Sequence, residues 1–345
     1  MYSESDLDEA VRHGVLSAGD VARFRAHVAA HRQSPAVDEE YVRLLSGFND
    51  IFVSIAIALV AIATYILTGS ALTRGVAMIA EAWLLAEYFT RQRHMALPSI
   101  LLLLLYAKGV AELLLHVVGV WVSGHLLSFL PFGAVGTKTG LYLTVGFTAG
   151  LEALAIYAHW LRFHVPITVA AGVASLVLLV IFLMLGLAPW LLPYWPWLTI
   201  LGGLCVFALA LRWDMSDRTR QTRRADVAFW LHLLAAPLLV HPAFYLLGLL
   251  KGGHSGDAGV AVGLYAALAL VALLVDRRAL LVSALGYVIY ALAHVLHSTG
   301  NEAGSLAVTA LIAGCALLLL SAFWHRTRAG LLRLLPGSLT ARLPA

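Results

Sequence analysis

The stretch LLLLLYAKGVAELLLHVVG, residues 101–119, places three ionisable side chains at helical spacing within an apolar run. Lys108, Glu112 and His116 follow one another at intervals of four, so on a helix they lie on one face. An ammonium, a carboxylate and an imidazole in a row can pair with one another or carry protons. Because a charge at the bilayer centre costs about 2.5–3.5 kcal/mol on insertion scales, we expect the row to line a polar cavity inside a helix bundle.

Other apolar runs carry single ionisable residues. Glu81 lies in the run before this stretch, Glu152 lies in the run after it, and His241 precedes Pro242 in LLVHPAF. A proline removes one helical hydrogen bond and frees a carbonyl, an arrangement found at transport sites and also at simple kinks. The sequence therefore predicts a polar path for a substrate or for protons, formed by Glu81, Lys108, Glu112, His116, Glu152 and His241.

The histidines offer a second chemistry, because two or more of them with a carboxylate can bind a metal. The segment HVLH presents His294 and His297 three residues apart, and His241 or Glu112 can complete the ligand set. A bound zinc ion, or another divalent transition metal, would activate water for hydrolysis. The alternative interpretation is therefore a metal site at His241, His294 and His297, whereas the leading interpretation requires no cofactor.

Several of these residues also have a purely structural interpretation. Lys108 and Glu112 can neutralise each other as an i,i+4 pair. Glu87 is placed to reach the arginines of the turn TRQRHM. His232, in FWLHLLAAP, is expected to be a core histidine hydrogen-bonded to a carbonyl of a neighbouring helix.

The composition is typical of a membrane protein. Of the 345 residues, 61% are hydrophobic and 12% are charged, whereas soluble domains carry about 25% charged residues. About 20 apolar residues are needed to cross the hydrocarbon core of a bilayer. The sequence predicts ten such spans, near 50–68, 73–91, 97–119, 140–161, 166–187, 194–212, 226–249, 258–275, 279–297 and 303–324.

The basic residues predict the orientation of these spans. Fourteen arginines fall in alternate turns and in the C-terminal tail, whereas the opposite loops and span ends hold only Arg74, Lys138 and Lys251. By the positive-inside rule, the arginine-rich turns and both termini are cytoplasmic. Arginines scattered in short turns between apolar runs are not typical of nucleic-acid binding, so membrane lipids are the expected partners, and self-association into a homo-oligomer is left open.

Three regions are expected along the chain. Residues 1–47 form a cytoplasmic helical hairpin with an amphipathic lead-in helix, residues 48–326 form the transmembrane bundle, and residues 327–345 form an amphipathic cytoplasmic tail. Within the hairpin, Gly14 ends the first helix, and Ser17 with Asp20 forms the capping box of the second. The hairpin EAVRHGVLSAGDVARFRAH, followed by spans paired across arginine turns, resembles a group of bacterial multi-pass membrane proteins of unknown function. That resemblance implies a topology and no activity.

The sequence thus predicts an all-α polytopic membrane protein of the bacterial inner membrane. Its leading functional interpretation is a proton-linked secondary transporter or permease for a small-molecule or lipid-like substrate. One alternative is a metal-dependent membrane enzyme acting on a lipid or envelope precursor near the outer face. Another is a non-catalytic anchor or sensor whose buried charges only lock helices together.

Overall fold

The computed structural model describes residues 4–24, 48–126, 136–217, 222–249, 257–278 and 302–333, with 280, 281, 285 and 289 between the last two ranges. The chain divides into two compact units, Met1–Tyr41 and Val42–Ala345. In their described residues both units consist of helices and turns and contain no strand. The all-helical fold class expected from the apolar runs is confirmed.

The N-terminal unit begins with α1 (Glu4–Arg12), which ends at a glycine turn. Gly14 has a φ of +70°, a left-handed conformation that glycine adopts at no steric cost. The next helical segment, residues 18–24, follows Ser17, whose hydroxyl oxygen accepts a hydrogen bond from the Asp20 amide at 3.1 Å. The amide of Ser17 donates in return to the Asp20 carboxylate at 3.4 Å. The predicted glycine stop and capping box are both confirmed, whereas the lead-in helix lies outside the described residues.

Replacing Ser17 with alanine is expected to weaken this segment by about 0.5–2 kcal/mol, the usual cost of losing an N-cap. The Ser17 hydroxyl also lowers the pKa of the Asp20 carboxyl below its ordinary value of 3.8. The resulting stability is present above the pKa of the unfolded chain and is lost as the pH falls through the lowered folded value. Hydrogen exchange of the amides in residues 17–24 of the full chain measures both effects. Equal exchange in the wild type and in Ser17→Ala would contradict the capping role.

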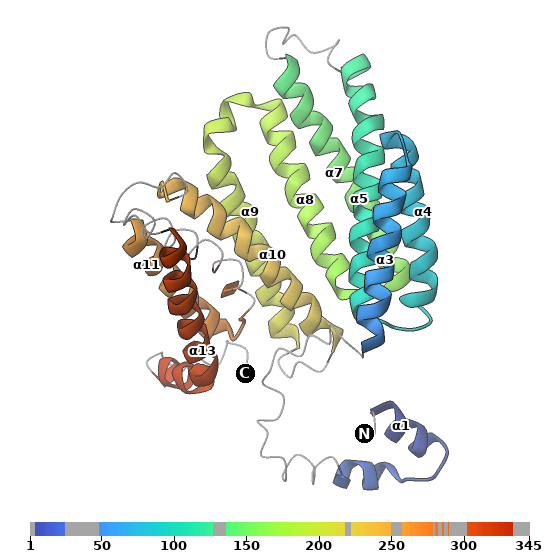
Figure 1. Ribbon diagram of the computed structural model, residues 1–345, viewed down its shortest axis with the longest axis vertical. Coiled ribbons are helices and arrows are strands. Elements are labelled where there is room, and N and C mark those ends of the chain that lie inside the picture. The colour runs from blue at the N-terminus through green and yellow to red at the C-terminus, as the bar shows by residue number, and fades with distance from the viewer. Residues whose placement is uncertain are drawn as a thin grey trace. The chain divides into compact units, whose positions relative to one another are not determined.

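The described part of the second unit consists mainly of long helices (Figure 1). A π-helical turn, Val122–Leu126, extends α5, and a 3₁₀ segment, Pro189–Tyr194, precedes α9. The long helices are α3 (Phe48–Leu67), α4 (Ala71–Phe89), α5 (Ala96–Trp121), α7 (Gly136–Phe163), α8 (Pro166–Leu187), α9 (Trp195–Ser216), α10 (Arg223–Leu246), α11 (Asp257–Val275) and α13 (Glu302–Arg333).

Six helices of the described chain are long and apolar enough to cross a membrane: α3, α5, α7, α8, α9 and α10. This supports the membrane assignment, but it does not confirm the count of ten spans. The helix α4, which carries Arg74, Glu81 and Glu87, is not among the six. Most of the predicted span at 279–297 lies outside the described residues, and α13 runs through Arg333, past the expected boundary at 326.

Two turns that contain a histidine in the left-handed conformation join α4 to α5 and α7 to α8. His94, His164 and Asp276 are the non-glycine residues with positive φ in the described chain, and each directly follows the end of a helix or of its last turn. Asparagine, aspartate and histidine adopt this left-handed conformation more often than other non-glycine residues. After His94 and His164 the backbone is extended for one residue, and α5 and α8 then begin. The pairs α4–α5, α7–α8 and α9–α10 make the most extensive helix contacts.

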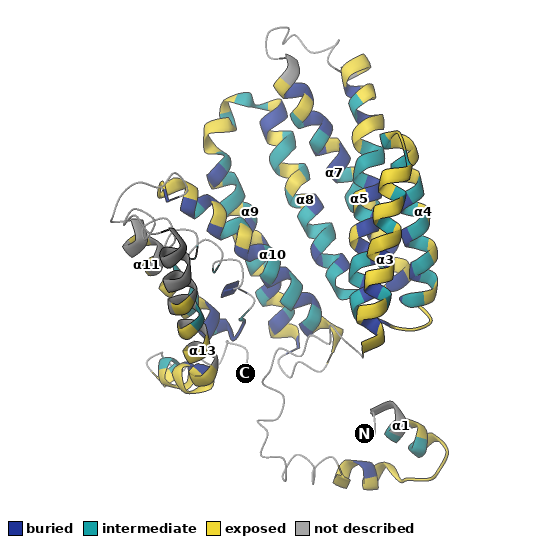
Figure 2. Cartoon of the chain, in the orientation of Figure 1, coloured by how far each residue is buried: buried dark blue, intermediate teal, exposed yellow. Residues whose placement is uncertain are grey.

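Burial differs strongly between helices (Figure 2). On α3, large apolar side chains such as Phe52, Leu59 and Ile66 are exposed, as suits a helix that faces lipid. On α10 half of the apolar window is buried, because the helix packs against α8 and α9 and shares apolar clusters with residues of α11 and α13. The helix α10 is therefore an internal element, and side chains on it are held on several sides.

The helices α4 and α5 approach closely at two glycines. A Cβ atom on Gly75 would lie 2.9 Å from the carbonyl oxygen of Gly109 and from the backbone nitrogen of Leu113. A Cβ atom on Gly109 would lie 2.9 Å from the Cβ of Met78. Glycine at both positions therefore lets the two backbones touch, as small residues do in membrane helix pairs. This contact sets the register that places Arg74 beside Glu112.

Candidate functional site

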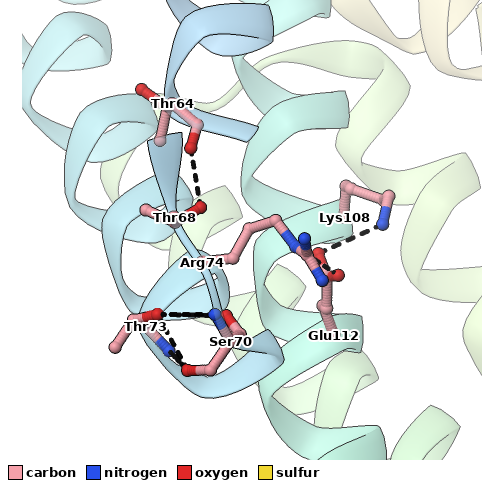
Figure 3. Close-up of polar contacts among 7 residues, drawn as sticks. All are labelled: Thr64, Thr68, Ser70, Thr73, Arg74, Lys108 and Glu112. Carbon is pink, nitrogen blue, oxygen red and sulfur yellow. Dashed lines mark hydrogen bonds and ion pairs between the residues drawn. The ribbon is translucent and has the colours of Figure 1, made fainter. Parts of the chain in front are cut away.

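The sequence-predicted row on α5 meets an arginine from α4 (Figure 3). Arg74 Nε donates to Glu112 Oε1 at 2.7 Å, and Lys108 Nζ donates to Glu112 Oε2 at 3.2 Å. The ring of Tyr65, in the last turn of α3, lies under both cations, with its centroid 4.5 Å from Arg74 Cζ and 5.7 Å from Lys108 Nζ. We call these four residues the cationic patch. The Glu112 carboxylate links α4 to α5, and the Tyr65 ring adds α3 through its contacts with the two cations.

The patch has an exposed side and a covered side. The side chain of Glu112 is 14% exposed and that of Arg74 is 20% exposed, whereas Lys108 is 54% exposed. A second polar contact also joins α3 to α4. The hydroxyl of Thr64, the residue before Tyr65, donates to Glu81 Oε2 at 2.7 Å. The predicted contact between Lys108 and Glu112 is thus present, and the partner that the sequence did not predict is Arg74.

The remaining residues of the predicted path lie apart. His116 is exposed on α5, and Glu152 is partly buried on α7 with no hydrogen bond or ion pair to the described residues. His241 is exposed on α10, where its ring centroid lies 6.0 Å from that of Trp195. Of the six path residues, only Lys108 and Glu112 are bonded to each other within the described chain. A continuous path through all six stays a prediction.

Glu87 forms the expected contact and a further one. Its carboxylate accepts from Arg91 Nη1 at 3.2 Å and from Arg162 Nε at 2.6 Å, so it links α4 to the end of α7. All three side chains are at least one-quarter exposed, so solvent screens each pair and its contribution to stability is small. This group links the end of α4, in the α4–α5 hairpin, to the end of α7, in the α7–α8 hairpin.

A buried charged group on α9 and α10 was not predicted. His232 Nε2 lies 2.8 Å from Asp214 Oδ2, and Arg277 Nε donates to the same oxygen at 3.1 Å. Arg277 Nη2 also contacts Asp214 Oδ1, which makes the pair bidentate. All three side chains are at most 3% exposed. The expected carbonyl partner of His232 is therefore replaced, at Nε2, by a carboxylate that also binds an arginine.

A signal for Asp214 exists in the sequence. Val206, Ala210 and Asp214 follow at intervals of four and are all buried, so the aspartate continues the buried face of α9. Asp214 falls within RWDMSDRTRQTRR, which is interpreted from sequence as a basic loop because of its many arginines. Arg277 is 63 residues away from Asp214 and gives no local signal.

Further polar contacts extend this buried group toward α13. Trp324 Nε1 donates to Asp276 Oδ1 at 2.7 Å, and Arg328 Nε donates to the carbonyl oxygen of Leu273 at 3.2 Å. Asp276 directly precedes Arg277, so the turn that ends α11 is held by Trp324 through Asp276 and by Asp214 through Arg277. These contacts hold the arginine at the level of Asp214.

A cavity of about 470 Å³ lies between the α7–α8 pair and the α9–α10 pair. Its walls are almost entirely apolar, and Leu234 and Leu238 of α10 contribute to them. Trp195 lines the cavity as well, and its ring centroid lies 4.9 Å from that of Tyr245. Pockets of 300–1,000 Å³ with apolar walls are typical of small-molecule sites. The cavity suits an apolar molecule or the apolar part of an amphipathic one.

A second buried histidine, His159 on α7, has a different environment. Its ring centroid lies 4.6 Å from that of Phe163, 5.3 Å from that of Tyr106 and 6.1 Å from that of Trp83. Neither ring nitrogen has a hydrogen-bond partner in the described chain. Leaving a buried donor unsatisfied costs about 1–3 kcal/mol.

We expect His159→Phe to keep or raise the melting temperature, because a phenyl ring fills this aromatic cluster without an unsatisfied nitrogen. The matched variant His232→Phe is expected to lower the melting temperature, because it leaves Asp214 and Arg277 without their third partner. Thermal unfolding of both variants in the same detergent measures the contrast. An equal decrease in the melting temperatures of the two variants would contradict the difference between the surroundings of His159 and His232.

The contacts of Glu112 predict unequal couplings in double-mutant cycles. The cycle Arg74→Gln with Glu112→Gln is expected to show a coupling of about 1.5–3 kcal/mol, because this pair is largely covered. The cycle Lys108→Gln with Glu112→Gln is expected to show about 0.2–1 kcal/mol, because Lys108 is exposed. Unfolding of the detergent-solubilised variants measures both. A larger coupling for Lys108 than for Arg74 would contradict the geometry.

In the described chain no group of three or more histidine, cysteine, aspartate or glutamate side chains is placed to hold a metal ion. His294 and His297 lie outside the described residues, so the alternative metal site with His241 stays a prediction. Comparison of the chain with protein-family models, with curated proteins and with solved structures finds no match. A function for this chain therefore follows from its own geometry.

Proposed function

We propose that the chain is a proton-linked secondary transporter for a lipid-like or otherwise amphipathic molecule. The observation that carries the proposal is the combination of three features on one helix, α10. It bears His232 of the buried charged group, two internal prolines, and the leucines that line the apolar cavity. A change at His232 can thus move the cavity-lining leucines by bending α10 at its prolines.

The buried charged group supports the proton-binding role. Intramembrane carboxylates and histidines in contact are a common basis of proton relays in transporters. Histidine changes its charge near neutral pH, and Asp214 holds His232 and Arg277 at once. Protonation of His232 would strengthen its attraction to Asp214 and change how that carboxylate is shared with Arg277. The partners come from α9, α10 and the turn after α11, so such a change acts on three elements.

The prolines support movement of the outer part of α10. Pro237 and Pro242 lie inside the helix, after His232 and on either side of the cavity-lining Leu238. Each proline removes an i to i−4 hydrogen bond, which permits a bend at that position. A bend there would move Leu238 and His241 relative to α8.

The cavity supports a lipid-like substrate. Its walls are apolar, whereas Trp195, Tyr245 and His241 lie together, so an apolar chain and a polar head find different surroundings. Aromatic residues with a polar edge are typical of the boundary between hydrocarbon and headgroups. The proposal includes a bacterial inner-membrane location with both termini cytoplasmic, for which the arginine-rich turns are the support.

The test uses the full chain in vesicles that contain a short-chain fluorescent phosphatidylethanolamine. Extraction by external albumin measures how fast the probe crosses the bilayer, with and without a pH gradient. We expect the gradient to accelerate crossing in the wild type and to have no effect in His232→Gln or Asp214→Asn. Arg212→Gln, an exposed change two residues from Asp214, serves as the control and should behave as the wild type. Identical wild-type rates with and without the gradient would refute proton-linked transport of this substrate class.

The alternative interpretation, a non-catalytic anchor or sensor, predicts a different result. It is favoured by the pairing of Glu87, Glu112 and Asp214, each of which joins separate helices. Under that interpretation the three charged groups only stabilise the bundle, and no variant changes the crossing rate once the protein is folded. The same vesicle experiment therefore separates the two functions.

A further inference from the structure

The cationic patch contains more positive than negative charge. Arg74 and Lys108 share the single carboxylate of Glu112, each through one of its oxygens. Tyr65 offers its ring face and adds no formal charge. In the described chain the hydrogen bond of Arg74 uses Nε, and its two terminal nitrogens make no hydrogen bond. The patch therefore has a surplus cation and spare donors.

The surroundings of the patch are apolar and exposed. Leu104, Lys108 and Leu115 lie within about 40° of one another on the α5 helical wheel, and all three are exposed. On α3, Ile62 and Ile66 flank Tyr65 and are exposed as well. Large apolar side chains around an exposed lysine indicate a surface that faces lipid rather than water.

The patch also lies close to one membrane surface. The helix α3 has 20 residues, which gives it a length of about 30 Å, the thickness of the hydrocarbon core. Tyr65 stands in its last turn and Arg74 in the first turn of α4, on either side of the turn at residues 68–70. Phospholipid phosphates lie just beyond the hydrocarbon, within reach of the long side chains of Arg74 and Lys108.

We propose that the cationic patch binds the phosphate group of an anionic phospholipid. Arg74 and Lys108 supply charge-assisted hydrogen bonds to the phosphate oxygens, and Glu112 holds both cations in place. The lipid chains lie along the exposed apolar side chains of α3 and α5. A phosphate there neutralises the surplus charge, which would otherwise stand uncompensated at the edge of the hydrocarbon. The proposal does not depend on the transport function, because it uses neither α10 nor the cavity.

The test is native mass spectrometry of the full chain, released from detergent that contains equal amounts of phosphatidylglycerol and phosphatidylcholine. We expect the wild type to retain phosphatidylglycerol preferentially. Lys108→Gln is expected to weaken this retention about tenfold or more, the effect of one lost charge-assisted contact. Lys108→Arg keeps the charge and should retain the lipid. Lys138→Gln removes an exposed lysine at the start of α7 and should have no effect.

Two outcomes of the lipid-retention measurement would overturn the proposal, and a competition experiment provides a third. One is equal retention of the two lipids by the wild type, which would mean that Lys108 only reaches toward water. The other is a loss in Lys138→Gln as large as that in Lys108→Gln, which would indicate general charge attraction. Soluble glycerol phosphate is included as a competitor, and displacement of the lipid at comparable concentration would assign the patch to a soluble anion instead. Melting curves of each variant confirm that the protein is folded.

Discussion

Replacing Asp214 with alanine is expected to lower the free energy of unfolding by about 3–5 kcal/mol, the usual cost of removing one partner from a buried ion pair. This free-energy loss is large because the side chains of Arg277 and His232, which are 3% and 0% exposed, would stay buried without their shared carboxylate. Thermal unfolding in detergent and the yield of monodisperse protein measure the effect.

The control for this change is Arg212→Gln, on the same helix and exposed. Surface substitutions of this kind usually change stability by no more than about 0.5 kcal/mol. Arg277→Lys is the second variant, since it keeps the charge but loses the bidentate contact with Asp214. It is expected to fall between Arg212→Gln and Asp214→Ala. Wild-type stability in Asp214→Ala would contradict the buried arrangement.

Replacing Gly109 with alanine is expected to destabilise the α4–α5 pair by about 1–3 kcal/mol, the usual cost of overpacking. The new Cβ would stand 2.9–3.0 Å from Met78 Cβ and from the backbone of Gly75 and Ile79. Backbone atoms cannot turn away as a flexible side chain can, so the two helices must separate. Separation moves Arg74 away from Glu112 and weakens the cationic patch as well.

Gly119→Ala provides the matched control, because Gly119 lies on the same helix and its Cβ would meet only Thr144 Cγ2, at an ordinary 3.6 Å. There alanine gains helix propensity, so stability is expected to stay constant or to rise by up to about 1 kcal/mol. Melting curves of the two variants give the comparison. A loss in Gly119→Ala equal to that in Gly109→Ala would show that the close helix contact is not the cause.

Local patterns in the sequence predicted the elements and the contacts within them. In the described chain, apolar runs placed the long helices to within about four residues, except that α13 continues to Arg333, beyond the predicted span end at 324. The Ser17–Asp20 box was found because its spacing is short and characteristic. The pairs Lys108–Glu112 and Glu87–Arg91 were found because i,i+4 neighbours meet on any helix. Contacts of this kind depend only on helix geometry.

Contacts between helices were harder to predict, because they depend on register and distance in the chain. Arg74 reaches Glu112 only because Gly75 and Gly109 set how α4 slides along α5. Asp214 and Arg277 are 63 residues apart in the chain, so no local pattern links them. Asp214 also lies in an arginine-rich segment, and such segments are typical of loops, so the sequence did not predict that it is buried. The apolar cavity has no sequence signature at all, since leucines that line it resemble those that fill a core.

The central claim is that protonation near His232 moves the part of α10 that follows Pro237. The most direct measurement is the distance between spin labels at Tyr245→Cys on α10 and Leu187→Cys at the end of α8, after the native cysteines Cys205 and Cys315 are replaced by serine. Double electron–electron resonance is recorded at about pH 5.5 and about pH 8, near the two ends of the physiological pH range. We expect two different distance distributions in this background and a single one, independent of pH, when His232→Gln is added. The same distribution at both pH values without that change would contradict the account.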